Sequence, residues 1–488
     1  MWRFAVDTGR YFPASLLPAF FSVAAAALFT RIFSPFSYGI YSLALAIVVP
    51  LTTVLSEWAA QPIGRFYAEY EHQGSGMQYR QLIAMLALII GVIVIVLVTL
   101  CAMGLLLIYG FVPHLLVFSG AAAVLLIQSL TAIVIPVLPA SLRPTQHRRA
   151  VVLSAGMSVT LAVALVYSAG ADVGWLLWGQ ALATTLMFPY VCRNAGVSFT
   201  PAVLNLSSQS IEMLQRFWRY GAPMMLWFVA SGILSLEDRY VIQVFRDSTE
   251  VGIYSANYGL VSGLSILLRA PVLMAAGPIL YHQWAQGAIK DAKHTIARMT
   301  ELYFILSFAL LGGFISAGEV LARLILGSAF WPGTTVLIPV LIGQIIWGAA
   351  SIGHKSLELH ERTMRMAWSA LFAALSNLAF NLILVPRFGY IAAAYTTLGS
   401  YVVYAALIWW QSRSFMPWSV DLRAVATYLG AMFVAAVAAR SALMFLPETS
   451  TVVRFGIAGT LFVLIYGVMV SGLAHKRVSL LLRAGSSL

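Results

Sequence analysis

Polar side chains within long apolar stretches are the residues of this sequence that could do chemistry. In the apolar stretch 38–64, Thr53, Glu57 and Gln61 follow one another at intervals of four residues. A helix places residues with that spacing on one face. Because an ionisable group in an apolar environment is costly, such a stripe favours a functional surface. The alternative is that Glu57 reaches an aqueous interface or forms a structural pair.

A second stripe lies in the apolar stretch 251–276, where Ser262, Ser265 and Arg269 are three and four residues apart. Arg269 lies well inside the helix that this stretch predicts. Once the internal repeat described below is applied, Arg269 falls within one position of Glu57. If the two repeats face each other, we expect a cation and an anion on the walls of one cavity.

Four further charged residues mark the ends of apolar stretches. Glu237, Asp238 and Arg239 are consecutive at the end of one stretch, and Arg31 closes the first stretch of the chain. One interpretation is that these charges end helices at an aqueous interface. The other is that Arg31 and Arg239 help to hold an anionic headgroup, with Glu237 or Asp238 as a protonatable, ion-coupling partner. The sequence leaves both open.

The chain contains an internal repeat that must position these residues. The four residues Gly39 to Ser42 recur as Gly252 to Ser255, 213 positions later. Arg149 to Thr185 aligns on Met366 to Tyr401 at a similar offset of 215 positions. Two matches at nearly one offset predict two related halves, an arrangement that places a transporter's substrate site between the halves.

Composition identifies a multi-pass membrane protein, because 61% of the 488 residues are hydrophobic and only 9% are charged. A helix needs about 20 apolar residues to cross a bilayer. The fold class we expect is therefore all-α, with fourteen candidate membrane helices. They are 11–33, 38–64, 81–109, 113–139, 150–170, 173–192, 219–237, 251–276, 297–318, 333–357, 364–385, 388–410, 422–444 and 452–473.

The positive charge sets the expected topology. Lys and Arg occur singly in short loops, which favours a membrane protein over a nucleic-acid partner for the net charge of +12. With a cytoplasmic N-terminus, 21 of the 29 Lys and Arg lie inside and 7 outside. Both termini are therefore predicted to be cytoplasmic. The expected division is an N-terminal lobe 1–192, a linker 193–218 leading into a short surface helix, a C-terminal lobe 219–410, and two extra helices with a tail, 411–488.

Motifs of catalysis are missing from the sequence. It contains no P-loop, no G-x-S-x-G, no H-E-x-x-H and no Cys and His cluster with metal-ligand spacing. No segment outside the predicted membrane helices is long enough for a separate catalytic domain. The sequence therefore predicts no enzyme, no cofactor and no bound metal.

Several motifs resemble those of the polysaccharide-transport branch of the MOP flippase superfamily. They are Arg31 with Ser34-Pro35, Tyr38-Gly39-Ile40-Tyr41, Tyr220-Gly221-Ala222-Pro223 at the start of the seventh helix, Asp238-Arg239, and Gly252-Ile253-Tyr254-Ser255. The resemblance runs through both halves, over about 400 residues. The polysaccharide-transport branch includes Wzx-type flippases for O-antigen and exopolysaccharide, and lipid II flippases and MATE exporters are more distant members of the superfamily.

The resemblance implies two lobes around a central cavity and transport by alternating access. It implies a substrate, an undecaprenyl-diphosphate-linked oligosaccharide, that crosses the bacterial inner membrane for lipopolysaccharide or exopolysaccharide synthesis. Membrane lipids are then partners, and a complex with polysaccharide polymerases or synthases stays open. Basic cavity residues are expected to bind the diphosphate, and Arg269 lies in the helix where such an arginine is expected. Glu57 matches no acid of the family.

Three alternatives remain at this point. A MATE-like, cation-coupled antiporter of drugs or small molecules would favour an acidic cavity and twelve helices, so Arg269 and the two extra helices argue against it. A membrane polymerase or glycosyltransferase would need a larger outer loop than this chain provides. A scaffold for biosynthetic enzymes is compatible with the sequence.

Overall fold

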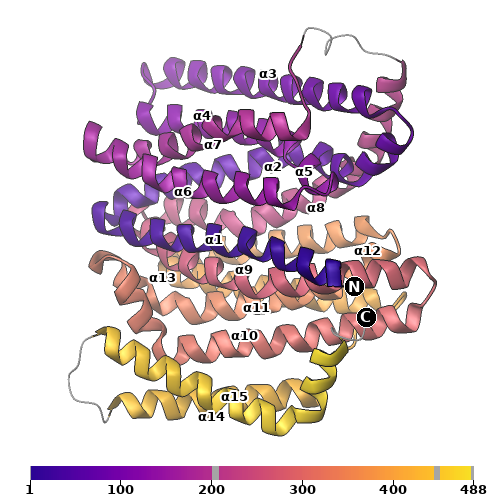
Figure 1. The fold of residues 1–488 in the computed structure, drawn as a ribbon. Coiled ribbons are helices and arrows are strands. Elements are labelled where there is room, and N and C mark those ends of the chain that lie inside the picture. Colours follow the sequence, from indigo (N-terminus) through magenta and orange to yellow (C-terminus); the bar gives the residue numbers. More distant parts are fainter. Residues whose placement is uncertain (1, 201–207, 445–450, 485–488) are drawn as a thin grey trace.

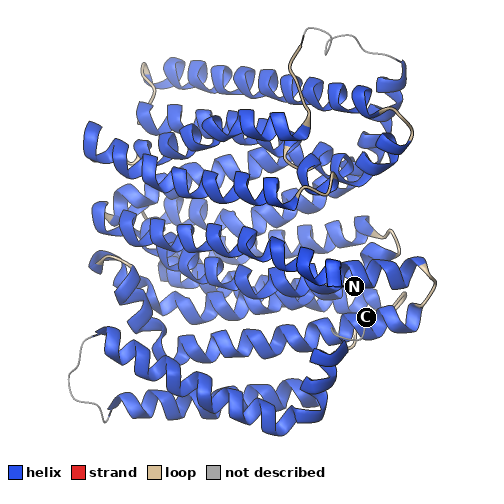
Figure 2. Ribbon diagram, in the orientation of Figure 1, coloured by secondary structure: helices blue, strands red, loops and turns tan. Residues whose placement is uncertain are grey.

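The computed structural model describes residues 2–200, 208–444 and 451–484, and some side chains within its helices, including that of Arg269, lie outside the described part. The described residues form helices joined by short loops and contain no strand (Figure 2). The helices lie side by side in one long stack (Figure 1). The all-α prediction is confirmed.

The N-terminal lobe occupies one end of the stack, drawn in indigo and purple in Figure 1. Its helices are α1 (Trp2–Ile32), α2 (Pro35–His72), α3 (Gly76–Tyr109), α4 (Leu115–Val134), the short α5 (Val137–Ala140), α6 (Pro144–Ala169) and α7 (Gly174–Ala195). Pro136 lies between α4 and α5, where its missing N–H interrupts the helical hydrogen bonds.

The C-terminal lobe follows with the same order of helices. Its elements are α8 (Ser208–Phe245), α9 (Ser248–Ala285), α10 (Ile289–Ile325), the 3₁₀ helix η2 (Ser328–Val336), α11 (Leu337–Gly353), α12 (Lys355–Leu359) and α13 (Thr363–Ser412). In the described residues before this lobe no separate surface helix occurs, and α8 is continuous from Ser208. The backbone of α13 breaks at Gly389, which has a φ of 62° that favours glycine. This break separates the predicted helices 364–385 and 388–410.

Each of the fourteen predicted stretches overlaps a helix of the structure. In the described part of the chain, nine helices are long and apolar enough to cross a membrane. The number of crossings therefore stays a prediction.

The start of the second helix of each lobe shows the repeat at atomic detail. Ser34 caps α2, and its hydroxyl accepts a hydrogen bond from the Ser37 N–H at 3.3 Å. Asp247, 213 positions later, caps α9 and accepts from the Glu250 N–H at 2.9 Å. Side-chain caps satisfy amides that a helix start leaves unpaired. Both lobes therefore begin their second helix at equivalent positions.

The last two helices, α14 (Leu422–Met444) and α15 (Thr451–Ala484), pack against α10 at the far end of the stack (Figure 1). Arg440 donates to the Ile315 carbonyl at 3.0 Å, and the Tyr466 hydroxyl donates to the Ile305 carbonyl at 2.9 Å. These helices extend the C-terminal lobe and do not enter the contact between the lobes.

The start of α1 and the end of α15 lie on the same side of the stack, at the helix ends drawn on the right (Figure 1). This side, which the charge count predicts to be cytoplasmic, is called the inner end of the helices below, and the opposite side the outer end. α2 joins the lobes, because it runs beside α8 and α9. The Tyr240 hydroxyl donates to the Leu43 carbonyl at 3.2 Å near the outer end, and Arg216 pairs with Glu69 at the inner end.

Candidate functional site

Asp238 of α8 is the best-bonded polar side chain within the C-terminal lobe. It is fully buried. The Tyr254 and Thr397 hydroxyls donate to its Oδ2 at 2.6 and 2.8 Å. The Asn377 and Asn381 amides donate to its Oδ1 at 3.1 and 2.7 Å. Three helices, α8, α9 and α13, therefore meet at one carboxylate, and the two asparagines of α13 bond across helices to α8.

The donors around Asp238 are all uncharged. Within the described residues, Asp238 forms no ion pair. Four donors match the acceptor capacity of an ionised carboxylate. The cluster therefore offers four donors to an ionised Asp238, and the neighbouring Arg239 adds a favourable charge.

Glu237 provides further acceptors beside Asp238. Its side chain is buried, and neither carboxyl oxygen has a hydrogen-bond partner. The Oδ1 atom of Asn377 is also buried without a partner. Unpaired acceptors are costly in a low-dielectric interior. A proton on Glu237, or a small cation between these oxygens, would satisfy them.

The donor set suits a monovalent cation or a proton. No group of three or more His, Cys, Asp or Glu that could hold a metal ion occurs in the described part of the chain. Carboxylate, amide and hydroxyl oxygens are hard ligands of low total charge. Such oxygens favour a proton or a monovalent cation over a soft transition metal.

Arg239 points from α8 toward α9, and its guanidinium lies 5.9 Å from the ring centre of Tyr254, a member of the Asp238 cluster. It is buried, its Nε donates to the Ser255 hydroxyl at 3.1 Å, and its guanidinium lies 5.1 Å from the centre of the Tyr258 ring. Tyr254 and Ser255 belong to the repeated Gly-Ile-Tyr-Ser sequence. Tyr254 bonds Asp238, and Ser255 bonds the adjacent Arg239. In this structure Arg239 is held by α9.

Arg31 lies at the outer end and joins the two lobes. Its guanidinium donates to the Ile325 and Leu324 carbonyls at 2.6 and 2.5 Å. Both carbonyls belong to the last turn of α10, where helix carbonyls lack partners and a cation is favourable. Counted from helix ends, Arg31 and Arg239 are not equivalent positions, because Arg31 is one residue from the end of α1 and Arg239 is six from the end of α8.

Glu57 is half-buried on α2 and accepts a hydrogen bond from the Gln61 amide at 2.9 Å. The shared face that their spacing predicted is therefore present. Arg269 belongs to α9, but its side chain lies outside the described part of the chain. Whether the two face one cavity thus stays a prediction.

At the outer end, α2 and α9 cross at the repeated glycines. A Cβ on Gly39 would overlap the Ser248 carbonyl, and a Cβ on Gly252 would overlap the Pro35 carbonyl. The contact is symmetric, since each glycine meets the carbonyl four residues before the other. Small residues permit such close backbone approach between membrane helices. The repeated sequence therefore closes the outer end.

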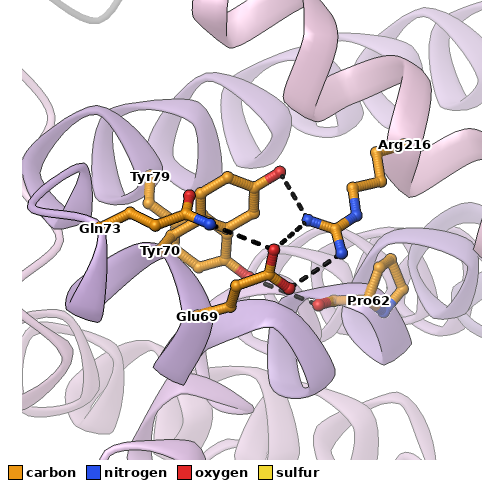
Figure 3. Close-up of polar contacts among 6 residues, drawn as sticks. All are labelled: Pro62, Glu69, Tyr70, Gln73, Tyr79 and Arg216. Carbon is orange, nitrogen blue, oxygen red and sulfur yellow. Dashed lines mark hydrogen bonds and ion pairs between the residues drawn. The ribbon is translucent and has the colours of Figure 1, made fainter.

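At the inner end, Arg216 of α8 forms a two-pronged ion pair with Glu69 of α2 (Figure 3). Its two terminal nitrogens lie 2.7 and 2.9 Å from the Glu69 oxygens. The guanidinium also lies 4.1 Å from the centre of the Phe66 ring. Phe66 packs in turn on Phe217 at 6.2 Å between ring centres. Both ends of the lobe contact are thus closed.

We expect Arg216→Ala to open the inner end in more molecules. Exposed ion pairs contribute about 1 kcal/mol at most, and about 1 kcal/mol corresponds to roughly a fivefold change in an equilibrium. Spin labels at the exposed positions Ala68 and Glu212 would report the separation of α2 and α8. Arg323→Ala is the control, because its ion pair lies within α10. An unchanged distance distribution would contradict the expectation.

Sequence reasoning missed four parts of this site. It singled out Asp238 but not the contact of that residue with Asn377 and Asn381. It did not assign a role to Thr397 or to the inner ion pair of Glu69. The only signal for Tyr254 was the repeated Gly-Ile-Tyr-Ser sequence, which indicated a repeat and not a ligand of the acid.

The fold is similar to solved membrane transporters. A lipid II flippase MurJ in an inward closed conformation shares 14% identity and a TM-score of 0.75, covering 98% of this chain and 100% of its own. An inward-facing multidrug resistance MATE family transporter of the MOP superfamily has 15% identity and a TM-score of 0.61, covering 86% and 95%. A MOP superfamily transporter from Pyrococcus furiosus has 13% identity and a TM-score of 0.61, covering 84% of this chain and 94% of its own. No match to a curated protein is found by sequence.

These similarities and the two-lobed bundle define the class: the chain is a multi-pass membrane protein with the MOP superfamily transporter fold. Residues 14–283 match the polysaccharide biosynthesis protein family. The match covers more than half of the chain, and the protein belongs to that family. The family predicted from the sequence is therefore confirmed.

Proposed function

We propose that this protein is a flippase that moves an undecaprenyl-diphosphate-linked oligosaccharide from the cytoplasmic to the outer leaflet of the bacterial inner membrane. The observation that carries the proposal is its membership of the polysaccharide biosynthesis family, combined with a transporter fold. Structural similarity to a lipid II flippase supports a lipid-linked substrate. This similarity covers 98% of the chain, a length that includes α14 and α15. O-antigen or exopolysaccharide synthesis is the process proposed.

Alternating access fits the contacts between the lobes. The outer end is closed by Gly39, Gly252 and Arg31, and the inner end by Glu69 and Arg216. Each closure is a separate group of contacts on α2 or α1, so one can break while the other holds. Transport then proceeds by opening the two ends in turn, with the lobes divided between α7 and α8 and both termini in the cytoplasm.

The proposed coupling site is the Asp238 cluster with Glu237. A transported proton or monovalent cation would bind these acceptors in one conformation and leave in the other. The cluster joins α8, α9 and α13, and two of these helices, α8 and α9, pack against α2 of the other lobe. A movement between the lobes can therefore change the cluster. Glu57 is a further candidate acid, since it lies on α2 next to Trp58, whose carbonyl contacts Gly221 of α8.

Arg31, Arg239 and Arg269 are the proposed basic residues for the diphosphate. Arginine keeps its proton and offers a planar fork that matches phosphate oxygens. In the conformation described, Arg31 and Arg239 are held by helix carbonyls and a serine. We propose that opening the lobes frees them for the headgroup.

Arg269→Ala is expected to abolish polysaccharide export, whereas Arg269→Lys keeps part of it. An alkyl ammonium preserves the charge but loses the two-pronged contact. Export is measured as surface polysaccharide, with membrane insertion measured by immunoblot of the membrane fraction. Full export by the alanine variant would assign Arg269 a structural role only.

The lipid-linked glycan pool of a strain lacking the protein tests the function. We expect one undecaprenyl-linked oligosaccharide to accumulate, with its sugars accessible only from the cytoplasmic side, detected by mass spectrometry and leaflet-selective labelling. An unchanged pool together with altered resistance to cationic compounds would favour the second candidate, a MATE-like antiporter, which the fold similarity to multidrug transporters supports.

A further inference from the structure

A cavity of about 400 Å³ lies in the N-terminal lobe, and no residue of the Asp238 cluster lines it. Residues of helices α1, α2, α4, α6 and α7 line it. Its size falls in the range of small-molecule sites, which begin at about 300 Å³. The proposed function uses none of its residues.

The lining of the cavity carries polar groups but no charge. Its polar members include Tyr41, Gln128, Ser154, Ser158 and Gln180, and none of its lining residues is Asp, Glu, Lys, Arg or His. Phe21 adds an aromatic face. A site without charge cannot compensate a diphosphate or an organic cation in a low-dielectric lobe.

These polar groups lack partners within the protein. In the described part of the chain, the Gln128 and Gln180 amides, the Ser154 and Ser158 hydroxyls and the Tyr41 hydroxyl make no hydrogen bond. Two amides can together offer four donors and two acceptors. Polar groups that face one volume in a membrane lobe can bind a polar occupant.

The repeat explains why this volume is open and neutral. Asp238 and Tyr254, which bond each other in the C-terminal lobe, lie 213 positions after Ala25 and Tyr41. Ala25 and Tyr41 both line the cavity. The N-terminal lobe thus keeps the tyrosine and has an alanine in place of the acid. The equivalent volume that holds a buried carboxylate in one lobe holds uncharged amides and hydroxyls in the other.

We propose that this cavity binds uncharged, hydroxyl-bearing sugar residues of the transported glycan, an inference that rests on the proposed function. Sugar hydroxyls both donate to and accept from amide and serine groups, and the C–H face of a pyranose packs on an aromatic ring such as Phe21. The diphosphate then binds the arginines, while this cavity contributes selectivity for the glycan.

The test compares binding of two lipids to the full-length protein in nanodiscs. One is undecaprenyl diphosphate, and the other is the undecaprenyl-linked glycan fraction extracted from a strain lacking the protein. Gln128→Leu and Gln180→Leu remove the amides with little change in volume. Each is expected to weaken binding of the glycan lipid about five- to tenfold, the effect of one or two lost hydrogen bonds, and to leave undecaprenyl diphosphate binding unchanged.

Gln411→Leu is the matched control, because it makes the same change in α13, outside the cavity. Thermal unfolding of each variant separates loss of folding from loss of binding, and Tyr41→Phe, which removes one hydroxyl, is a milder second variant. Undiminished glycan binding by both leucine variants, or equal loss for both lipids, would overturn the inference while leaving the function intact. Failure of the wild-type protein to bind either lipid would overturn both.

Discussion

Replacing Asp238 with asparagine is expected to abolish transport and to lower the stability of the C-terminal lobe. Four donors point at the Asp238 oxygens. An asparagine presents its own N–H groups to two of them, and each buried donor left unpaired costs about 1–3 kcal/mol. The negative charge that would attract a cation is also lost. We expect at least a 100-fold fall in transport, from the about 3 kcal/mol or more that a broken buried charge site costs.

Transport in this experiment is measured as surface polysaccharide in cells that contain equal amounts of the protein. Asp291→Asn is the matched control, because Asp291 is exposed at the inner end of α10, outside the cluster. Glu237→Gln separates coupling from stability, since Glu237 makes no hydrogen bond that the change could break. Normal export by the Asp238→Asn variant would rule out the cluster as a coupling site.

Adding a single methyl group where α2 and α9 cross at the outer end is expected to reduce polysaccharide export strongly, as the Asp238→Asn change does. In Gly39→Ala, the new Cβ overlaps the Ser248 carbonyl, and backbone on both sides prevents local adjustment. Overpacking of this kind costs about 1–3 kcal/mol, so the closed outer end becomes about 5- to 150-fold rarer. Gly252→Ala meets the Pro35 carbonyl in the same way and is expected to give the same loss of export.

The two glycine variants together test the symmetry of the crossing. Because both changes act on one contact, the double variant is expected to lose less than the sum of the single effects. Gly104→Ala in α3 is the control, since a Cβ at that position meets no atom. Export at the control level by either glycine variant would show that the outer end closes elsewhere.

The repeat and the helices could be read from the sequence because both depend on local patterns. A bilayer demands long apolar helices, so the fourteen stretches, the all-α class and the two related halves follow from runs of apolar residues and a few polar landmarks. The equivalence of Ser34 and Asp247 as caps is of the same local kind, although only the structure revealed it.

The chemistry of the site depended on contacts between residues far apart in the chain. Asp238 and Glu237 stood out as charges at a helix end, but their burial depends on α13, whose asparagines are about 140 positions away. An interfacial charge and a buried one look alike in sequence, because burial is a property of the neighbours. The neutral cavity of the N-terminal lobe was invisible for the same reason.

The sequence by itself determined that this protein is a helical membrane protein of the polysaccharide biosynthesis family with two related halves. Hydropathy and repeated motifs are one-dimensional signals, and membrane physics allows few folds for them. Only the tertiary structure decided which charges are buried, that the repeated glycines close the outer end, and that one lobe carries an acid where the other has an open neutral cavity. Those properties depend on distances between helices, and distances arise only when the helices pack.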